Sequence, residues 1–120
     1  MQIDLDWRRE RSALWPEVSY EIRPLRVWAF QELMAYWERQ AAPGTEGTGA
    51  ADGLALLAVA RRIFPDHVRD VQGLTLTREG ETAPATPEAL CEEAPLAPLA
   101  GEIVARLVAA SEIGDDAEKK

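Results

Sequence analysis

Hydrophobic and polar residues alternate at two places near the N-terminus of this 120-residue chain. Residues 2–7 read QIDLDW and residues 17–23 read EVSYEIR, so apolar side chains occupy every second position in both stretches. A period of two is typical of a half-buried β-strand. Pro24 follows the second stretch and lacks the N–H that a strand paired on both sides needs. We therefore expect two short strands, joined as a hairpin across the polar segment RRERSA at 8–13.

From Leu25 the hydrophobic period becomes helical, and we expect an amphipathic helix of about four turns that ends near Gln40. On a wheel of about 100° per residue, one broad face collects the apolar residues Val27, Phe30, Leu33, Met34 and Trp37. The opposite face collects the polar residues Gln31, Glu32, Glu38 and Arg39. The pattern predicts that the apolar face, Trp37 included, lies in the hydrophobic core.

The segment GTEGTGAADG at 44–53 holds half of the eight glycines in the chain. A phosphate-binding P-loop follows a strand and carries a lysine, whereas this segment follows a predicted helix and no lysine occurs before Lys119. A dinucleotide-binding loop also needs a preceding strand and a different glycine spacing. We therefore interpret residues 41–53 as a mobile linker between two helices, which binds no ligand.

A second helix is predicted from Leu54 to about Phe64 in the apolar segment that follows. Asp52 is its expected N-cap, because a short acceptor side chain satisfies the free N–H groups of the first turn. Pro65 is expected to end the helix. The following segment VRDVQGLTLT, residues 68–77, is rich in β-branched residues and is predicted as a strand.

Turn and helix signals organise the rest of the chain. REGE at 78–81 predicts a turn in which Gly80 takes a positive φ, and APATP at 83–87 predicts a loop. Thr86 is expected to cap a short helix that begins at Pro87, since proline at the first helical position loses no hydrogen bond.

The last helix is predicted from about Pro98 to Ile113. Its expected buried stripe consists of Leu99, Ile103, Leu107 and Ala110. Gly114 is the expected C-cap. Together these elements predict an α+β fold with three to four helices packed with a small, mostly antiparallel set of short strands. We expect a single globular domain over residues 1–114, followed by a polar C-terminal tail at 115–120.

Charge and composition exclude several classes of protein. The chain has 21 acidic and 13 basic residues, and its net charge of −8 argues against nucleic acid as the main ligand. The longest apolar runs, GLALLAVA and IVARLVAA, are shorter than the roughly 20 residues of a membrane span. A single cysteine permits neither an intrachain disulfide nor a thiolate metal cage, and it fits a reducing cytoplasm.

Catalytic residue types are scarce in this sequence. His67 and Cys91 are the only histidine and the only cysteine, so a Cys–His pair is the one nucleophilic arrangement to consider. Glu92 and Glu93 beside the thiol would raise its pKa and disfavour the thiolate. We interpret His67 as a loop or strand-edge residue. We therefore expect no catalytic residues, no cofactor and no metal, and a protein that is not an enzyme.

The four tryptophans are more informative than the charges. Trp28 falls on the polar side of the predicted helix, with Glu32, Ala35 and Arg39. Either the N-terminal hairpin or Trp15 covers Trp28 within the monomer, or a second subunit or partner protein covers it. Tryptophan is a favoured anchor of protein interfaces. The candidate partner-binding residues are Trp28, Trp15 and Trp7.

Two segments resemble a known family. YEIRPLRVWAFQEL leads from a short strand into an amphipathic helix, and HVRDVQGLTLTREGETAPATPEAL contains Val71-x-Gly73-Leu74, then Gly80, then a TPEAL helix start. The chain closes with an apolar helix and SEIGDDAEKK. This order resembles the tail assembly chaperones encoded among the tail genes of long-tailed bacteriophages. The similarity covers roughly positions 18–120, and the chain ends in two lysines where the family often ends in Lys-Asn.

The resemblance implies a helical, non-catalytic protein that self-associates and binds tape measure or tail tube subunits until the tail polymerises. It places the protein in the host cytoplasm, with no nucleic acid or membrane as partner. The alternative is a structural component that remains in the virion tail or in another large complex. A pocket that joined His67, Cys91 and a carboxylate would indicate an enzyme instead.

Overall fold

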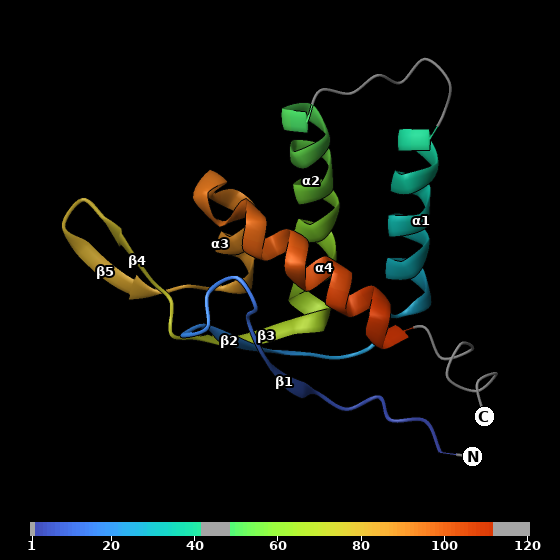
Figure 1. Cartoon of the computed structure of the whole chain (residues 1–120), viewed down its shortest axis with the longest axis horizontal. Coiled ribbons are helices and arrows are strands. Elements are labelled where there is room, and N and C mark those ends of the chain that lie inside the picture. The colour runs from blue at the N-terminus through green and yellow to red at the C-terminus, as the bar shows by residue number, and fades with distance from the viewer. Residues whose placement is uncertain (1, 42–48, 112–120) are drawn as a thin grey trace.

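The computed structural model describes residues 2–41 and 49–111 and has an α+β fold, as predicted (Figure 1). One antiparallel sheet has the strand order β1 (Arg8–Arg11), β2 (Ser19–Ile22), β3 (Val68–Gln72), and a second contains β4 (Thr75–Arg78) and β5 (Glu81–Pro84). The helices are α1 (Val27–Ala41), α2 (Gly49–His67), α3 (Pro87–Glu92), the 3₁₀ turn η1 (Ala94–Leu96) and α4 (Ala97–Ser111).

Helix α2 is the central element, because it contacts α1, α3 and α4. Figure 1 shows α1 and α2 standing side by side, with α4 crossing in front of them and the three-stranded sheet beneath. The β4–β5 hairpin projects away from the helices. The fold therefore packs helices on one face of the three-stranded sheet and leaves the other face in solvent.

The hydrophobic core lies between β2, α1, α2, α3 and α4. Its largest fully buried apolar side chains include Tyr20, Ile22, Leu33, Ile63, Phe64, Leu90, Leu99, Ile103 and Leu107. The stripe predicted for the last helix is thus confirmed at Leu99, Ile103 and Leu107, while Ala110 is half-buried.

The rotational phase of α1 differs from the prediction. Its buried stripe consists of Ala29, Leu33 and Tyr36, whereas Trp37 is 38% exposed and Val27 is 73% exposed. The predicted core position of Trp37 is therefore wrong. Two apolar stripes lie side by side on this helix, and hydrophobic period alone does not tell which one faces α2. The small side chain of Ala29 allows the two helices to approach closely.

The first strand begins later in the sequence than predicted, at Arg8 and not within residues 2–7. β1 pairs with β2 in the register Arg8↔Ile22 to Arg11↔Ser19, so the polar RRER segment is the strand. Residues 2–7 form no strand, and Ile3 and Leu5 are 50% and 65% exposed. The hairpin itself is confirmed. The strand prediction for residues 2–7 is wrong because β2 ends at Ile22 and leaves those residues no neighbour to pair with.

Helix α2 is longer than predicted at both ends. It begins at Gly49, so Asp52 lies inside the helix and is not its N-cap, and residues 49–53 are not linker. The helix also continues past Pro65 to His67. At the other end of the predicted linker, Ala41 belongs to α1, and the rest of the linker, residues 42–48, lies outside the described residues.

The strand predicted for residues 68–77 is divided at Gly73, which has a φ of +80°. A Cβ at this position would lie 1.9 Å from the carbonyl oxygen of Glu17, so only glycine fits there. The second half becomes β4, which pairs with β5. The loop predicted for residues 83–87 is therefore wrong at residues 83 and 84, which belong to β5. The turn between β4 and β5 has Gly80 at a φ of +82°, as predicted.

The predicted start of the short helix is confirmed, because the Thr86 hydroxyl accepts a hydrogen bond of 3.2 Å from the Ala89 N–H at the N-terminus of α3. Gly114 and the tail at 115–120 lie outside the described residues. The segment Ala94–Ser111 is long and apolar enough to cross a membrane by length and composition, a test that a core helix also passes. In the fold it supplies core residues that pack against α2 and α3.

Candidate functional site

Two of the three candidate tryptophans are engaged within the chain. Two guanidinium groups lie over the ring of Trp7, that of Arg23 at 4.8 Å and that of Arg69 at 4.2 Å from its centroid. Trp15 is half-buried and packs against the hydrophobic core. Cation–π contacts at an exposed site contribute on the order of 0.5–1 kcal/mol each. Trp7 therefore helps to hold the start of β1 on the outer face of the sheet.

Trp28 lies at a polar edge of α1. Its ring centroid is 5.7 Å from that of His67, and 38% of the residue is exposed. Neither the N-terminal hairpin nor Trp15 is its ring partner; that partner comes from α2. An open depression beside it is lined by Trp28, Gln31, Glu32, Ala35 and Arg39.

Glu32 ties this edge of α1 to α2, because its carboxylate pairs with the Arg62 guanidinium at 2.6 Å. Both side chains are partly exposed, so the pair contributes little to stability. Its main consequence is positional. The Trp28 edge of α1 therefore faces Arg62 of α2 and is mostly polar.

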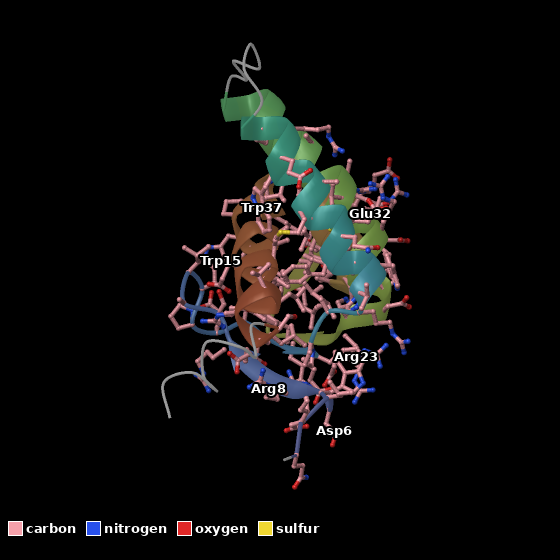
Figure 2. All side chains as sticks on the ribbon, turned by 90° about the vertical axis from the view of Figure 1, so that its right-hand side faces the viewer. Asp6, Arg8, Trp15, Arg23, Glu32 and Trp37 are labelled. Atoms are coloured by element: carbon pink, nitrogen blue, oxygen red, sulfur yellow. The ribbon has the colours of Figure 1, made fainter. Side chains whose placement is uncertain are left out.

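The second apolar stripe of α1, which we call the outer stripe, consists of Val27, Phe30, Met34 and Trp37. Phe30 and Met34 are half-buried, and the two end residues are exposed. In Figure 2, Trp37 and Glu32 lie on opposite sides of α1, with Trp37 on the side of α4. The outer stripe is thus separate from the Trp28 edge.

The spacing within the outer stripe is three, four and three residues. This is the a/d spacing of a heptad, which places a continuous apolar seam along one side of a helix and suits a second helix as partner. The eleven residues from Val27 to Trp37 span about 15 Å along the helix axis, from the Cα of the first to the Cα of the last. The seam is therefore long enough to receive about three turns of a partner helix.

His67 fixes the N-terminal end of α1. Its Nδ1–H donates to the Ile63 carbonyl oxygen at 2.8 Å, and its Nε2 accepts from the Arg26 N–H at 3.0 Å, which assigns the neutral tautomer. The Leu25 N–H donates to the Ser111 hydroxyl at 2.8 Å. Side chains from the C-terminal ends of α2 and α4 thus hold the backbone that enters α1.

The prediction that His67 is a loop or strand-edge residue is wrong: it is the last residue of α2 and is fully buried. Burial lowers the pKa of His67 below its ordinary value, and the positive charges of Arg23 and Arg26 add to this effect. The hydrogen bond to Ile63 and the charge of Asp66 act in the opposite direction without reversing it. The imidazole is therefore neutral in the folded protein near pH 7.

Acidification from about pH 7 to about pH 5.5 should lower the free energy of unfolding. The unfolded chain binds a proton at His67 below about pH 6.5, whereas the folded chain does not, so stability falls by at most about 1.4 kcal/mol per pH unit. Urea titrations across this range measure the slope. The His67→Gln variant contains no other histidine and should show a flat profile. An equal slope in that variant would assign the effect to other groups.

Cys91 is buried on α3 and is placed as a structural residue. Burial, together with the carboxylates of Glu88 and Glu92, raises the pKa of its thiol to about 12. Both ring nitrogens of His67 are engaged elsewhere, with Ile63 and Arg26. Within residues 2–41 and 49–111 there is also no group of three or more potential metal ligands.

Cys91 should resist a thiol reagent at about pH 8 in the folded protein, because it is buried and protonated. Addition of denaturant should raise the labelling rate to that of a free cysteine. The measurement is the rate of labelling against urea concentration. Rapid labelling in native buffer would mean that α3 opens readily or that the thiol is more accessible than the fold indicates.

Glu102 forms the most extensive polar network of the described chain. Its carboxylate on α4 accepts hydrogen bonds from the Tyr20 hydroxyl at 2.7 Å, from the backbone N–H groups of Ala13 and Leu14 at 2.8 and 3.1 Å, and from the Ser12 hydroxyl at 3.2 Å. Burial alone would raise the pKa of Glu102, but these donors outweigh it and lower the pKa below its usual value. The network fastens the loop after β1 to α4.

Arg106 completes this network one turn further along α4. Its guanidinium donates to the Tyr20 hydroxyl at 2.9 Å and to the Arg11 carbonyl oxygen at 2.6 Å. Among the described residues, no buried side-chain nitrogen or oxygen lacks a hydrogen bond. The sequence analysis missed this network. The one signal that pointed to it is that Glu102 and Arg106, four residues apart, are the charged residues of the otherwise apolar helix α4.

The sequence matches no protein-family model, and neither a curated protein nor a solved structure shows significant similarity to it.

Proposed function

We propose that this protein is a non-enzymatic tail assembly chaperone or adaptor of a long-tailed bacteriophage. It binds an apolar helical segment of a tape measure or tail tube subunit along the outer stripe of α1, in the host cytoplasm. The observation that carries the proposal is the a/d seam of Val27, Phe30, Met34 and Trp37, whose two end residues are exposed and whose two middle residues are half-buried. A partner helix that covers this seam removes apolar surface from water on both sides.

The residues that carry the family resemblance occupy positions that determine the fold. Gly73 and Gly80 both have a positive φ, Thr86 caps α3, and Leu90 is fully buried. A family that shares these residues would share the β3–β4–β5–α3 unit. The resemblance therefore supports a common fold, and the partner-binding part of the proposal rests on the outer stripe.

Charge is compatible with this role. An excess of acidic residues gives a net charge of −8, which favours solubility in a protein with an apolar seam on its surface. The two most chemically reactive side chains, those of His67 and Cys91, are both buried, and both ring nitrogens of His67 are hydrogen-bonded within the fold. These observations favour a binding protein over an enzyme.

A structural component of the virion tail is the second candidate function. The same exposed tryptophans would then lie in a permanent interface. Mass spectrometry of purified particles separates the two candidates. A chaperone is absent from the mature particle, and a structural component is present in a fixed ratio to the tail tube subunit.

Co-expression tests the proposed function. The protein is produced together with the tape measure or tail tube subunit encoded near its own gene, and the soluble fraction of that subunit is measured. We expect this fraction to rise severalfold with the wild-type protein. Val27→Asp places a charge on the most exposed residue of the outer stripe and should abolish the rise.

The matched control is Gln31→Asp, which adds a charge to the same helix on its polar side. It should solubilise the subunit as well as the wild-type protein does. No rise with the wild-type protein, or an equal rise with Val27→Asp, would refute the proposal.

A further inference from the structure

Strand β1 forms an open edge of the sheet, because it pairs with β2 on one side and with no other strand of the described chain. The Ser12 N–H donates to the Val18 carbonyl oxygen, which continues the β1–β2 ladder by one residue. Alternate residues of an antiparallel ladder direct their backbone groups to the neighbouring strand, so those of Arg9 and Arg11 point away from β2. The Arg11 carbonyl oxygen accepts from Arg106, which leaves both outward N–H groups and the Arg9 carbonyl as a template for another strand.

The side chains of this edge are basic on both faces of the sheet. Residues that lie opposite each other on neighbouring strands share a face, and successive residues of one strand alternate between faces. Arg9 and Arg11 therefore lie on the solvent side with Glu21, whereas Arg8 lies on the other side with Ile22. All three arginines are exposed. A strand that adds to this edge meets guanidinium groups on both sides of its backbone.

Two of these three arginines have no acidic partner. Arg9 pairs with carboxylates of β2 and β3. Neither Arg8 nor Arg11 forms an ion pair with a carboxylate of residues 2–41 or 49–111. The Arg11 guanidinium has only a long hydrogen bond of 3.4 Å to the Pro16 carbonyl oxygen. The charges of Arg8 and Arg11 are therefore open to carboxylates of another molecule.

The local charge of the sheet is opposite to that of the whole chain. The three strands and the residue after β2 have a net charge of +2, whereas the chain has −8. The charged residues of this region are Arg8, Arg9, Arg11, Arg23 and Arg69 against Glu10, Glu21 and Asp70. A basic edge repels the same edge of another copy and attracts an acidic strand. Nucleic acid is disfavoured, because its closely spaced phosphates would also face the acidic rest of the chain.

We propose that β1 is a docking edge for an extended acidic segment of a partner protein, which adds to the sheet as a fourth strand. Its backbone bonds to the outward groups of Arg9 and Arg11. Consecutive acidic residues point to opposite faces, so their carboxylates pair with Arg8 on one face and with Arg11 on the other. The ladder is short, so the arginines supply the selectivity. This edge is separate from the outer stripe of α1, and the inference does not depend on the proposed function.

A fluorescent peptide with four consecutive glutamates between two Thr-Val ends tests the proposal by anisotropy. We expect saturable binding to the wild-type protein that weakens at least fivefold between about 50 and about 300 mM salt, since the arginines are exposed. The same peptide with lysines in place of the glutamates should bind at least tenfold more weakly. So should the peptide that is N-methylated at each glutamate, because it keeps the charge and loses the backbone donors.

The double variant Arg8→Glu with Arg11→Glu reverses both unpaired charges and spares Arg9, which has partners within the sheet. It should keep the wild-type thermal melt and bind the acidic peptide at least tenfold more weakly. The matched control, Arg61→Glu with Arg62→Glu, changes the net charge by the same amount on α2 and should bind within about twofold of wild type. An equal loss in both variants would assign the binding to overall charge and refute the proposal.

Amide hydrogen exchange of the wild-type protein gives a local readout that needs no variant. The acidic peptide should slow exchange at the outward N–H groups of Arg9 and Arg11 at least tenfold and leave that of Glu10, which faces β2, unchanged. Peptide binding without this protection would overturn the proposal, and so would the absence of saturable binding at about 1 mM protein. Tighter binding of a single-stranded DNA of about eight nucleotides than of the acidic peptide would assign the edge to nucleic acid instead.

Discussion

Leu33→Ala should lower the free energy of unfolding by about 2–5 kcal/mol, the range measured when a buried leucine is truncated and leaves a cavity. Leu33 is fully buried and lies in the middle of the stripe that α1 packs against α2. The other two buried residues of the stripe are Ala29 and Tyr36. The alanine side chain is too small, and the tyrosine ring too rigid, to fill the space that Leu33 would leave. Urea unfolding followed by circular dichroism measures the change.

Trp37→Ala is the matched control on the same helix. Although tryptophan is larger than leucine, Trp37 is partly exposed, and its truncation should cost less than about 2 kcal/mol. The order of the two losses is the decisive result. A larger loss for Trp37→Ala than for Leu33→Ala would mean that α1 is rotated, with the outer stripe in the core.

Glu102→Ala should be the most damaging substitution of a charged residue in the described chain, at roughly 2–3 kcal/mol. It removes the acceptor for two hydroxyl groups and two backbone N–H groups, and it leaves the Tyr20 hydroxyl buried with only Arg106 nearby. The loop after β1 would also lose its attachment to α4. The measurement is the free energy of unfolding at pH 7, with hydrogen exchange at Ala13 and Leu14 as a local readout.

Glu102→Gln separates charge from shape. The amide keeps one acceptor oxygen but presents an NH₂ group to the donors that met the other carboxylate oxygen. Glu102→Gln should therefore lose about half as much free energy of unfolding as Glu102→Ala. Because the pKa of Glu102 is lowered in the folded state, the difference between wild type and Glu102→Gln should be present above the unfolded pKa and should vanish as pH falls through the folded pKa. A difference that persists in acid would point to packing alone.

Local signals in the sequence determined the parts of the fold that were predicted correctly. Gly80 needs no partner to favour a positive φ, and Thr86 followed by Pro87 specifies a helix start from adjacent residues alone. The stripe of α4 was predictable because its largest apolar residues, Leu99, Ile103 and Leu107, are spaced four residues apart and so share one face. In each case the structure depends on residues within one or two turns of the chain.

The errors arose where tertiary contacts choose between local alternatives. Residues 2–7 alternate better than residues 8–11, yet the strand forms at RRER because that is the segment the β2 register reaches. Helix α1 has two apolar stripes, and the choice between them depends on α2. The Glu102 network joins residues 82 to 90 positions apart, a separation at which a single sequence carries no pairing signal.

The candidate site was predicted only in part. Exposed tryptophan on α1 was expected at Trp28, and the structure leaves Trp28 and Trp37 equally exposed. Trp28 lines the depression that Glu32 also lines, and Trp37 lies on the opposite side of the helix from Glu32. No observation tests the partner-binding role predicted for Trp28, and the proposed function assigns partner binding to the outer stripe instead. The outer stripe escaped the sequence analysis because the same residues were assigned to the core.

The measurement that tests the proposed function most directly compares these two tryptophans. A tape measure or tail tube segment that co-purifies with the protein is titrated against the wild type, Trp37→Ala and Trp28→Ala, each first checked for native helix content. Truncation of an interface tryptophan costs about 2 kcal/mol or more, so Trp37→Ala should weaken binding by roughly 30-fold or more, while Trp28→Ala leaves it within about twofold. The reverse result, with binding lost in Trp28→Ala and kept in Trp37→Ala, would contradict binding at the outer stripe.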